Sequence, residues 1–151
     1  MKRILITFVL AIAIIGVSNA QDKSEKELIK KTILSAYQDG LLNEGDAAKV
    51  DKGFHSDFEM LGVDKDGKMY RYHIKDWKAN NEKKVADGRL PKKKEDKVKI
   101  KIPMVDVTGI AAVAKINFYV KEKLVFVDYQ SLYKLDGKWK IVAKIYHTVK
   151  D

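Results

Sequence analysis

Two side chains capable of acid–base chemistry lie close together near the end of the sequence. Asp128 interrupts the apolar and aromatic stretch "FVDYQSLYKL", and His147 ends the stretch "KIVAKIYH". A carboxylate beside an imidazole can hold a polar ligand group, or take up and return a proton during a reaction. A buried carboxylate is costly unless it is paired or hydrogen-bonded, so the alternative is a structural Asp128 that binds His147, a tyrosine or backbone donors.

The strands that carry these residues are predicted from the turn between them. Asp136-Gly137 is a strong signal for a two-residue β-hairpin loop, which pairs Leu135 with Lys138. Paired residues share a face of the sheet. One face then carries Phe126, Asp128, Gln130, Leu132, Ile141, Ala143, Ile145 and His147. The other carries Val127, Tyr129, Ser131, Tyr133, Lys140, Val142, Lys144 and Tyr146.

The preceding strand supports this register. Alternate apolar residues of "AAVAKINFYV" reach the same face as Phe126 when the loop has an odd length, such as Lys121–Lys123. Phe118 then faces Phe126, and Ile116 faces Asp128. We therefore expect Asp128 on the apolar, helix-covered face, with His147 as its diagonal neighbour.

Helical patterns dominate the part of the chain before these strands. "SEKELIKKTILSAYQDGLL" has apolar residues at helical spacing, with a capping box at Ser24 and Glu27 and the helix end near Gly40. Asp46 caps a shorter second helix that Gly53 closes. A third helix is expected in "IKDWKANNEKKVADG".

Shorter strands are predicted between and after the helices. "DFEMLGV" and "KMYRYH" form a strand pair around the turn "DKDG". From Lys97 the apolar residues alternate, and this alternation shifts by one residue after Pro103. Such a shift indicates a β-bulge or an edge strand.

The N-terminal segment is typical of a secretory signal peptide. Lys2 and Arg3 precede the apolar run "ILITFVLAIAIIGV", and "SNA" supplies a cleavage site after Ala20. We expect a signal peptide at 1–20, a single domain at 21–151, and export to the periplasm or the medium. An uncleaved N-terminal anchor is the alternative. The chain has no cysteine, which excludes disulfides and a lipoprotein anchor.

The basic composition suggests few specific partners. The formal net charge is +9, but export argues against nucleic acid as a partner, and "PKKKEDKVKIK" is a solvated loop that leads into a strand. Attraction to an anionic envelope surface is a milder possibility. No metal-binding His spacing, Gly-rich phosphate loop or cysteine nucleophile is present, so no metal and no cofactor are expected.

Three motifs carry a resemblance to a known superfamily. They are "ILSAYQDGLLNEGDAAKVDKGFHSDFEML", "AAVAKI" and "VDYQSLYKLDGKWKIVAKIYH". The chain resembles the nuclear transport factor 2-like superfamily, which includes SnoaL-like proteins, and within it the small exported proteins of the putative lumazine-binding family. The resemblance implies an α+β fold, in which a curved, mostly antiparallel sheet wraps around three helices as a cone. The family often has Asn near Ala143, so one polar pocket contact is in doubt.

A pocket at the wide end of the cone is also implied by the resemblance. His55 corresponds to a histidine that points toward the pocket in family members, although a surface loop position is the alternative. The complete candidate ligand-binding set is His55, Tyr72, Trp77, Phe118, Asp128 and His147. The aromatic members of this set could equally be core residues. No residue is assigned a catalytic role.

Three functions are compatible with these observations. An exported domain that binds a small, partly aromatic molecule ranks first. An interaction protein without a ligand ranks second and is favoured by a cavity below about 300 Å³. An acid–base isomerase or dehydratase ranks third. The predicted outer face carries Tyr129, Tyr133, Val142 and Tyr146, from which we expect a homodimer.

Overall fold

A long helix opens the part of the chain that the structure describes. The structure is a computed structural model that describes residues 22–149, so the predicted signal peptide lies outside the described residues. Residues 22–32 are α-helical and lead into η1 (Ile33–Glu44), which is wound as a π-helix. Because the helix already includes Ser24, the predicted capping box does not mark its start.

The end of this helix lies further along the chain than predicted. The helix continues to Glu44 and is capped by Gly45, whose positive φ of 73° suits glycine. Gly40, predicted to mark the end, is instead buried. A Cβ atom there would lie 2.8 Å from the Cβ of Lys49, so Gly40 permits close packing of η1 against the second helix.

Two shorter helices follow as the sequence predicts. In α2 (Ala47–Gly53), the Asp46 carboxylate accepts a 3.0 Å hydrogen bond from the Lys49 backbone nitrogen, which is the expected cap. The third helix, α3 (Ile74–Ala86), follows the strand pair.

Six strands form one curved, mostly antiparallel sheet. They are β1 (Phe54–Val63), β2 (Met69–His73), β3 (Lys99–Thr108), β4 (Ala111–Val120), β5 (Lys123–Leu135) and β6 (Lys138–Thr148). Their order in the sheet is β2-β1-β6-β5-β4-β3, and the pairing of β1 with β6 is parallel. The edge strand β3 shifts its register between Lys101 and Met104, which confirms the irregularity predicted at Pro103.

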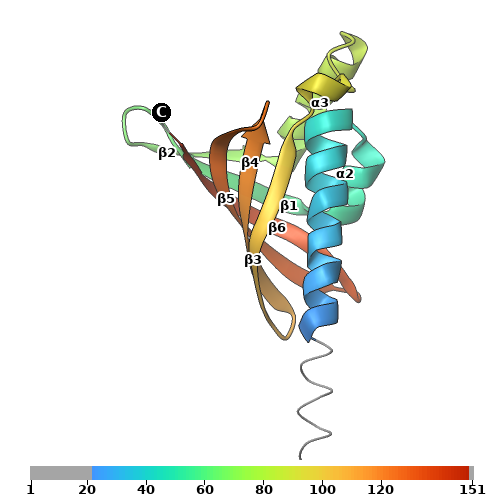
Figure 1. Ribbon diagram of the computed structural model, residues 1–151, viewed down its shortest axis with the longest axis vertical. Coiled ribbons are helices and arrows are strands. Elements are labelled where there is room, and N and C mark those ends of the chain that lie inside the picture. The colour runs from blue at the N-terminus through green and yellow to red at the C-terminus, as the bar shows by residue number, and fades with distance from the viewer. Residues whose placement is uncertain (1–21, 150–151) are drawn as a thin grey trace, which may run out of the picture.

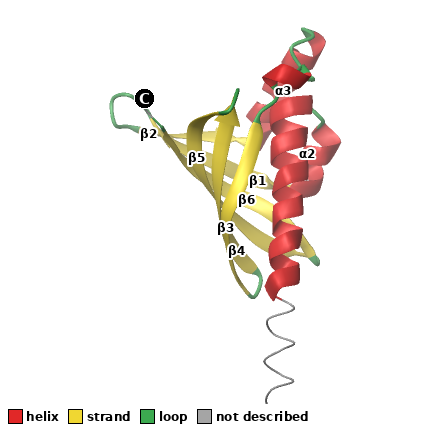
Figure 2. Cartoon of the chain, viewed as in Figure 1, coloured by secondary structure: helices red, strands yellow, loops and turns green. Residues whose placement is uncertain are grey.

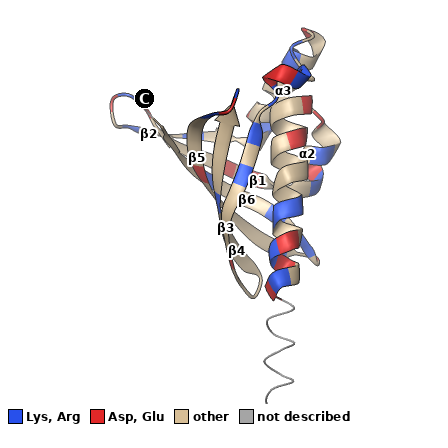
Figure 3. Ribbon diagram, in the orientation of Figure 1, with Lys and Arg blue, Asp and Glu red and all other residues tan. Residues whose placement is uncertain are grey.

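The helices cover one side of the sheet, here called the inner face (Figures 1 and 2). The opposite side is the outer face. Figure 3 shows acidic and basic residues interspersed along the helices. The buried side of the first helix, with Ile29, Ile33 and Leu41, belongs to the same core cluster as Ile116 and Ile141 of the sheet. This arrangement confirms the α+β fold with three helices inside a curved sheet.

The register of the last hairpin is confirmed only near its turn. Leu135 pairs with Lys138 and Leu132 with Ile141, as predicted, but the register then shifts between Ser131 and Leu132. Val142 is the additional residue in β6, because Ser131 pairs with Ala143.

This bulge reverses every later side chain of β6. Lys144 now pairs with Gln130 and Tyr146 with Asp128, so both lie on the inner face. Ile145 and His147 lie on the outer face. The prediction that His147 shares a face with Asp128 is therefore wrong, as is the placement of Tyr146 and Lys144 on the outer face.

The preceding hairpin follows the prediction closely. Phe118 pairs with Phe126, and Ile116 pairs with Asp128. The register shifts only beyond Phe118, where a tight turn at Lys121 and Glu122 joins the strands. None of the helices that the structure describes is long and apolar enough to cross a bilayer.

Candidate functional site

A buried cluster of three polar side chains joins the first helix to the sheet. The Tyr37 hydroxyl donates a 2.7 Å hydrogen bond to Asp128 Oδ2. Lys144 Nζ donates to the Tyr37 hydroxyl at 2.9 Å and to Asp128 Oδ2 at 3.2 Å. Asp128 is 0% exposed and Lys144 is 6% exposed. Asp128 is thus a buried carboxylate with two donor partners, neither of which is His147.

Each member of this cluster is positioned by a different element. Tyr37 is on the apolar side of η1, where helical spacing directs it to the core. Asp128 is at the middle of β5, and its inward orientation follows from the alternation of the strand. Lys144 faces inward only because of the bulge at Val142. The bulge therefore completes the cluster.

Burial changes the acid–base behaviour of two of these groups. Burial lowers the pKa of the Lys144 ammonium, while the Asp128 carboxylate acts in the opposite direction. Burial also raises the pKa of the Tyr37 phenol well above its ordinary value, and the charge and hydrogen bond of Asp128 add to this effect. Tyr37 therefore stays protonated as a donor to Asp128.

Three aromatic rings surround the Lys144 amine. Its nitrogen lies 5.1 Å from the ring centre of Tyr37, 5.6 Å from that of Trp77 and 5.2 Å from that of Tyr146. The negative faces of such rings attract a cation at this distance. The rings and Asp128 together stabilise a charge that burial alone would disfavour.

A small cavity opens beside the cluster. Its volume is about 190 Å³. It is lined by Tyr37, Leu42, Met60, Trp77, Phe118, Phe126, Lys144 and Tyr146. The lining is mainly apolar and aromatic, with the amine of Lys144 and the hydroxyls of Tyr37 and Tyr146 as its polar groups. This composition is typical of small-molecule sites, although the volume is below their usual range of about 300–1,000 Å³.

Some polar atoms beside the cluster have no partner among the described residues. They are Asp128 Oδ1 and both side-chain polar atoms of Gln130. Gln130 is fully buried and pairs with Lys144 across the strands. Buried polar groups are nearly always hydrogen-bonded, so these atoms leave hydrogen-bonding capacity on the inner face for a polar guest or for water.

Larger hollows elsewhere lack a buried charge. One of about 460 Å³ is lined by His55 together with Phe54, Ile74 and Lys140, among others. Another, of about 290 Å³, lies between the first helix, α2 and the last hairpin, where several lysines line it. Among these hollows, the smaller aromatic cavity alone is lined by a buried ionisable side chain, Lys144, and it is therefore the candidate site.

The structure brings together only part of the predicted set of site residues. Trp77 and Phe118 line the cavity, and Asp128 binds two of its lining residues. Tyr72 lies behind Trp77, with their ring centres 5.8 Å apart, and its hydroxyl donates to the Asp76 carbonyl.

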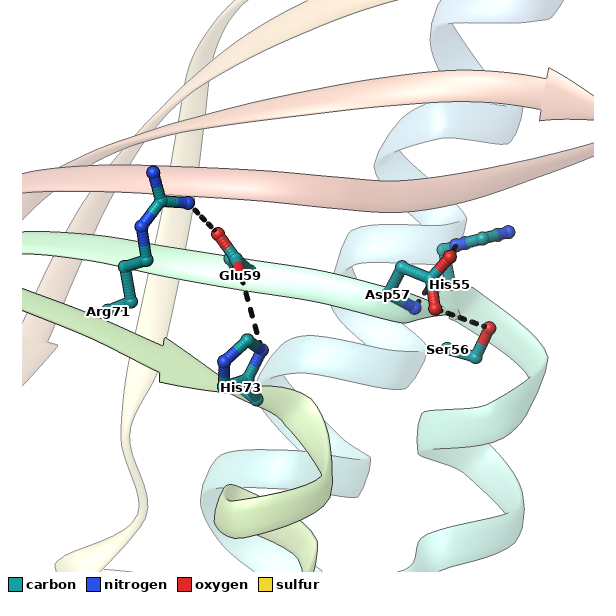
Figure 4. A network of polar contacts seen from close by, with 6 residues as sticks. All are labelled: His55, Ser56, Asp57, Glu59, Arg71 and His73. Carbon is teal, nitrogen blue, oxygen red and sulfur yellow. Dashed lines mark hydrogen bonds and ion pairs between the residues drawn. The ribbon is translucent and has the colours of Figure 1, made fainter.

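The two histidines of that set lie elsewhere. His147 is exposed on the outer face, opposite Val127. His55 lines the separate hollow of about 460 Å³. Its Nδ1 accepts a 3.2 Å hydrogen bond from the Asp57 backbone nitrogen. Figure 4 shows His55 with Ser56 and Asp57, apart from a second cluster in which Glu59 contacts Arg71 and His73.

Sequence reasoning missed Tyr37, Lys144 and Tyr146 as site residues. The helical spacing of the first helix places Tyr37 on its apolar side, and a buried tyrosine hydroxyl usually needs a hydrogen-bond partner, so this residue carried a usable signal. The sequence contains no comparable signal for Lys144. Ala143, the position of the expected family Asn, pairs with Ser131 on the outer face. No group of residues that could hold a metal ion occurs within residues 22–149.

Comparisons with known proteins agree with this architecture. The profile of the family described as "Putative lumazine-binding" matches residues 24–147. An NTF2-like protein of unknown function from Shewanella baltica is 30% identical, with a TM-score of 0.63, and the match covers 85% of this chain and 96% of that one. An NTF2-like protein of unknown function from Silicibacter pomeroyi is 18% identical, with a TM-score of 0.66. The match covers 84% of this chain and 98% of that one.

A curated relative is also similar in sequence. Aldolase FrzH from Cladobotryum sp is 24% identical over 108 residues, which are 71% of this chain and 79% of that protein. The family match spans most of the described chain, and the solved structures share its fold. The chain therefore belongs to the putative lumazine-binding family of the NTF2-like superfamily.

Proposed function

We propose that the protein is an exported domain that binds a small, flat molecule in the aromatic cavity. The observation that carries this proposal is a buried amine, Lys144, that lines a mainly apolar and aromatic cavity. Rings such as Trp77 and Phe118 suit a flat apolar body. Lys144 and the Tyr146 hydroxyl suit a carbonyl or anionic edge, because both can donate hydrogen bonds.

The cavity volume limits the size of this ligand. At about 190 Å³, it suits a molecule of one or two rings rather than a drug-sized compound. The description of the family supports a heteroaromatic ligand such as lumazine, whose fused rings carry carbonyl groups on one edge.

Tryptophan fluorescence provides the test. The chain has two tryptophans. Trp77 lines the cavity, whereas Trp139 is buried elsewhere and donates to the Glu25 carboxylate. In a Trp139→Phe background, we expect lumazine to quench Trp77 saturably. The matched Trp77→Phe protein should show no saturable quenching of its remaining Trp139. Quenching of Trp139 alone, or none in either protein, would contradict the proposal.

A second candidate is an interaction protein without a ligand. It is favoured by the small cavity volume and by the exposed aromatic side chains of the outer face, including Tyr133 at 47% exposure. A folded protein that shows no ligand-dependent fluorescence change but associates through the outer face would support this role.

An enzymatic role is supported by a separate observation. A buried lysine beside a carboxylate is a pair that can react with carbonyl groups, and a relative at 24% identity is named an aldolase. A role in carbonyl chemistry would require Lys144 to react with an aldehyde or ketone in the cavity.

Export is proposed from the sequence pattern of residues 1–20. Intact-mass analysis of the envelope fraction should find a chain that begins at Gln21. A full-length chain retained in the membrane fraction would favour an anchor instead.

A further inference from the structure

We propose that Lys144 forms an imine with a small aldehyde or ketone held in the aromatic cavity. The proposal rests on the proposed function, because the carbonyl compound must first enter this cavity. It adds a covalent step that simple ligand binding does not require.

Lys144 is distinguished from the other lysines by its position. Lys144 is buried, whereas the other lysines of residues 22–149 are partly or fully exposed. Its side chain also lines the aromatic cavity. A lysine in a hydrophobic pocket is a recognised nucleophile for carbonyl groups, because desolvation favours the neutral amine. The lowered pKa of Lys144 agrees with this chemistry.

Asp128 is placed to take the proton that the amine must lose. Its Oδ2 lies 3.2 Å from Lys144 Nζ. Transfer of this proton converts the ion pair to a neutral amine and a neutral carboxylic acid, so no unpaired charge is left in the interior. The Tyr37 hydroxyl is hydrogen-bonded to both groups, keeps its own proton and keeps the amine and the carboxylate in contact.

The reaction then balances with the groups present. The amine nitrogen attacks the carbonyl carbon, and one nitrogen proton moves to the oxygen, which gives a neutral carbinolamine. Protonated Asp128 returns its proton to the carbinolamine hydroxyl, the C–O bond breaks and water leaves. The product is a protonated imine on Lys144 beside the Asp128 carboxylate, so the pair has the same net charge before and after the reaction.

The surroundings suit this product. The rings of Trp77, Tyr37 and Tyr146 lie 5.1 to 5.6 Å from the nitrogen and stabilise its positive charge. The small volume favours an aromatic or short aliphatic aldehyde over a large ketone.

Reductive trapping tests the proposal. The protein is incubated with benzaldehyde and cyanoborohydride, which converts an imine to a stable secondary amine, and the modified lysines are identified by peptide mass mapping. Lys65, which is exposed in the β1–β2 turn, serves as the internal reference. We expect Lys144 to be modified at least tenfold faster than Lys65. Equal or slower modification of Lys144 would overturn the proposal.

Two variants check the roles of the pair. Lys144→Arg keeps a cation beside Asp128 but cannot form an imine, so the fast modification should disappear while that of Lys65 is unchanged. Asp128→Asn keeps the shape but removes the base, and modification of Lys144 should slow severalfold in protein that circular dichroism shows to be folded. Unchanged modification in folded Asp128→Asn would refute the role of Asp128.

Running the lumazine titration and the trapping reaction on the same Trp139→Phe preparation separates the two proposals. Saturable Trp77 quenching without trapping at Lys144 would overturn the imine and leave the binding function intact. Loss of both signals would overturn both.

Discussion

Tyr37 and Asp128, 91 residues apart in the sequence, are joined by a 2.7 Å hydrogen bond. Tyr37 belongs to η1 and Asp128 to the middle of β5, so this buried contact connects the helical layer to the sheet. Lys144 contacts both residues from β6. The stability of the fold and the chemistry of the cavity therefore depend on the same three side chains.

Removing the Tyr37 hydroxyl should destabilise the protein. Tyr37→Phe takes one donor from a fully buried carboxylate, for which we expect a loss of about 1–3 kcal/mol in the free energy of unfolding. Urea denaturation followed by circular dichroism measures this loss. Tyr133→Phe, at an exposed position, should leave the unfolding midpoint unchanged. Equal stability of the two variants would show that the hydroxyl is not needed by Asp128.

Removing the Lys144 charge should have a larger effect. Lys144→Met leaves the Asp128 carboxylate buried without its cation, which should cost roughly 3–5 kcal/mol. The double variant Asp128→Leu/Lys144→Met replaces the pair by apolar groups and should recover most of this loss. A double variant no more stable than Lys144→Met would contradict the pairing.

A surface ion pair offers the matched control. Lys99 contacts Glu122 at 2.5 Å, with both side chains mostly exposed. Lys99→Met should therefore produce no measurable change in the urea midpoint, because solvent screens such pairs.

The protein should lose stability at alkaline pH through Tyr146. Its hydrogen bond with the Tyr70 hydroxyl, at 2.5 Å, is the main cause that raises the pKa of Tyr146 to about 12, and burial adds to it. An unfolded tyrosine titrates near pH 10. The folded state thus holds the proton more tightly, and the resulting stability is complete below pH 10 and decreases as the pH rises toward 12.

Ultraviolet absorbance of tyrosinate checks this prediction. The difference between wild type and Tyr146→Phe isolates the titration of Tyr146. Repeating the comparison in a Tyr70→Phe background should move this titration to lower pH. A Tyr146 transition near pH 10 in the wild type would contradict the assignment.

Association through the outer face remains a prediction. Tyr129, Tyr133 and Ile145 are exposed there, the last at 54%. We expect a homodimer at micromolar concentration and its dissociation by Tyr129→Glu, because a charge in an apolar interface is costly. Light scattering measures the mass. Leu34→Glu, on the first helix, is the matched control and should remain dimeric; a monomeric wild type would refute the prediction.

Much of the fold could be predicted from local sequence signals. The Asp136-Gly137 turn gave the correct pairing of Leu135 with Lys138, and the alternation of β4 gave the correct pairing of Ile116 with Asp128. These signals succeed because a turn fixes the register of adjacent residues, and an apolar face fixes which side of the strand is buried.

The candidate site was less predictable because it depends on one additional residue. "IVAKIYH" can be assigned to either face, since apolar residues occur in both phases. Val142 forms the bulge, and no glycine or proline marks it in the sequence. The bulge places Lys144 and Tyr146 on the inner face, where Ile145 and His147 were predicted. The contact of Lys144 with Tyr37 of η1 is made on the inner face, and a partner on a distant helix cannot be read from the sequence of a single strand.

The parallel pairing of β1 with β6 has a consequence for synthesis on the ribosome. Phe54 lies beside Ile141 and Leu61 beside Ile145, while Glu25 accepts hydrogen bonds from Lys134 and Trp139. A nascent chain that has reached only β3 can pair β1 with β2, but it lacks β6, the other neighbour of β1, and the two residues that bind Glu25 of the first helix. Because pairing across such long sequence separations is slow, we expect the sheet to close only after β6 has been synthesised. Until then the apolar side of the first helix lacks its partners in the sheet, and exposed apolar surface of this kind makes a folding intermediate prone to aggregate.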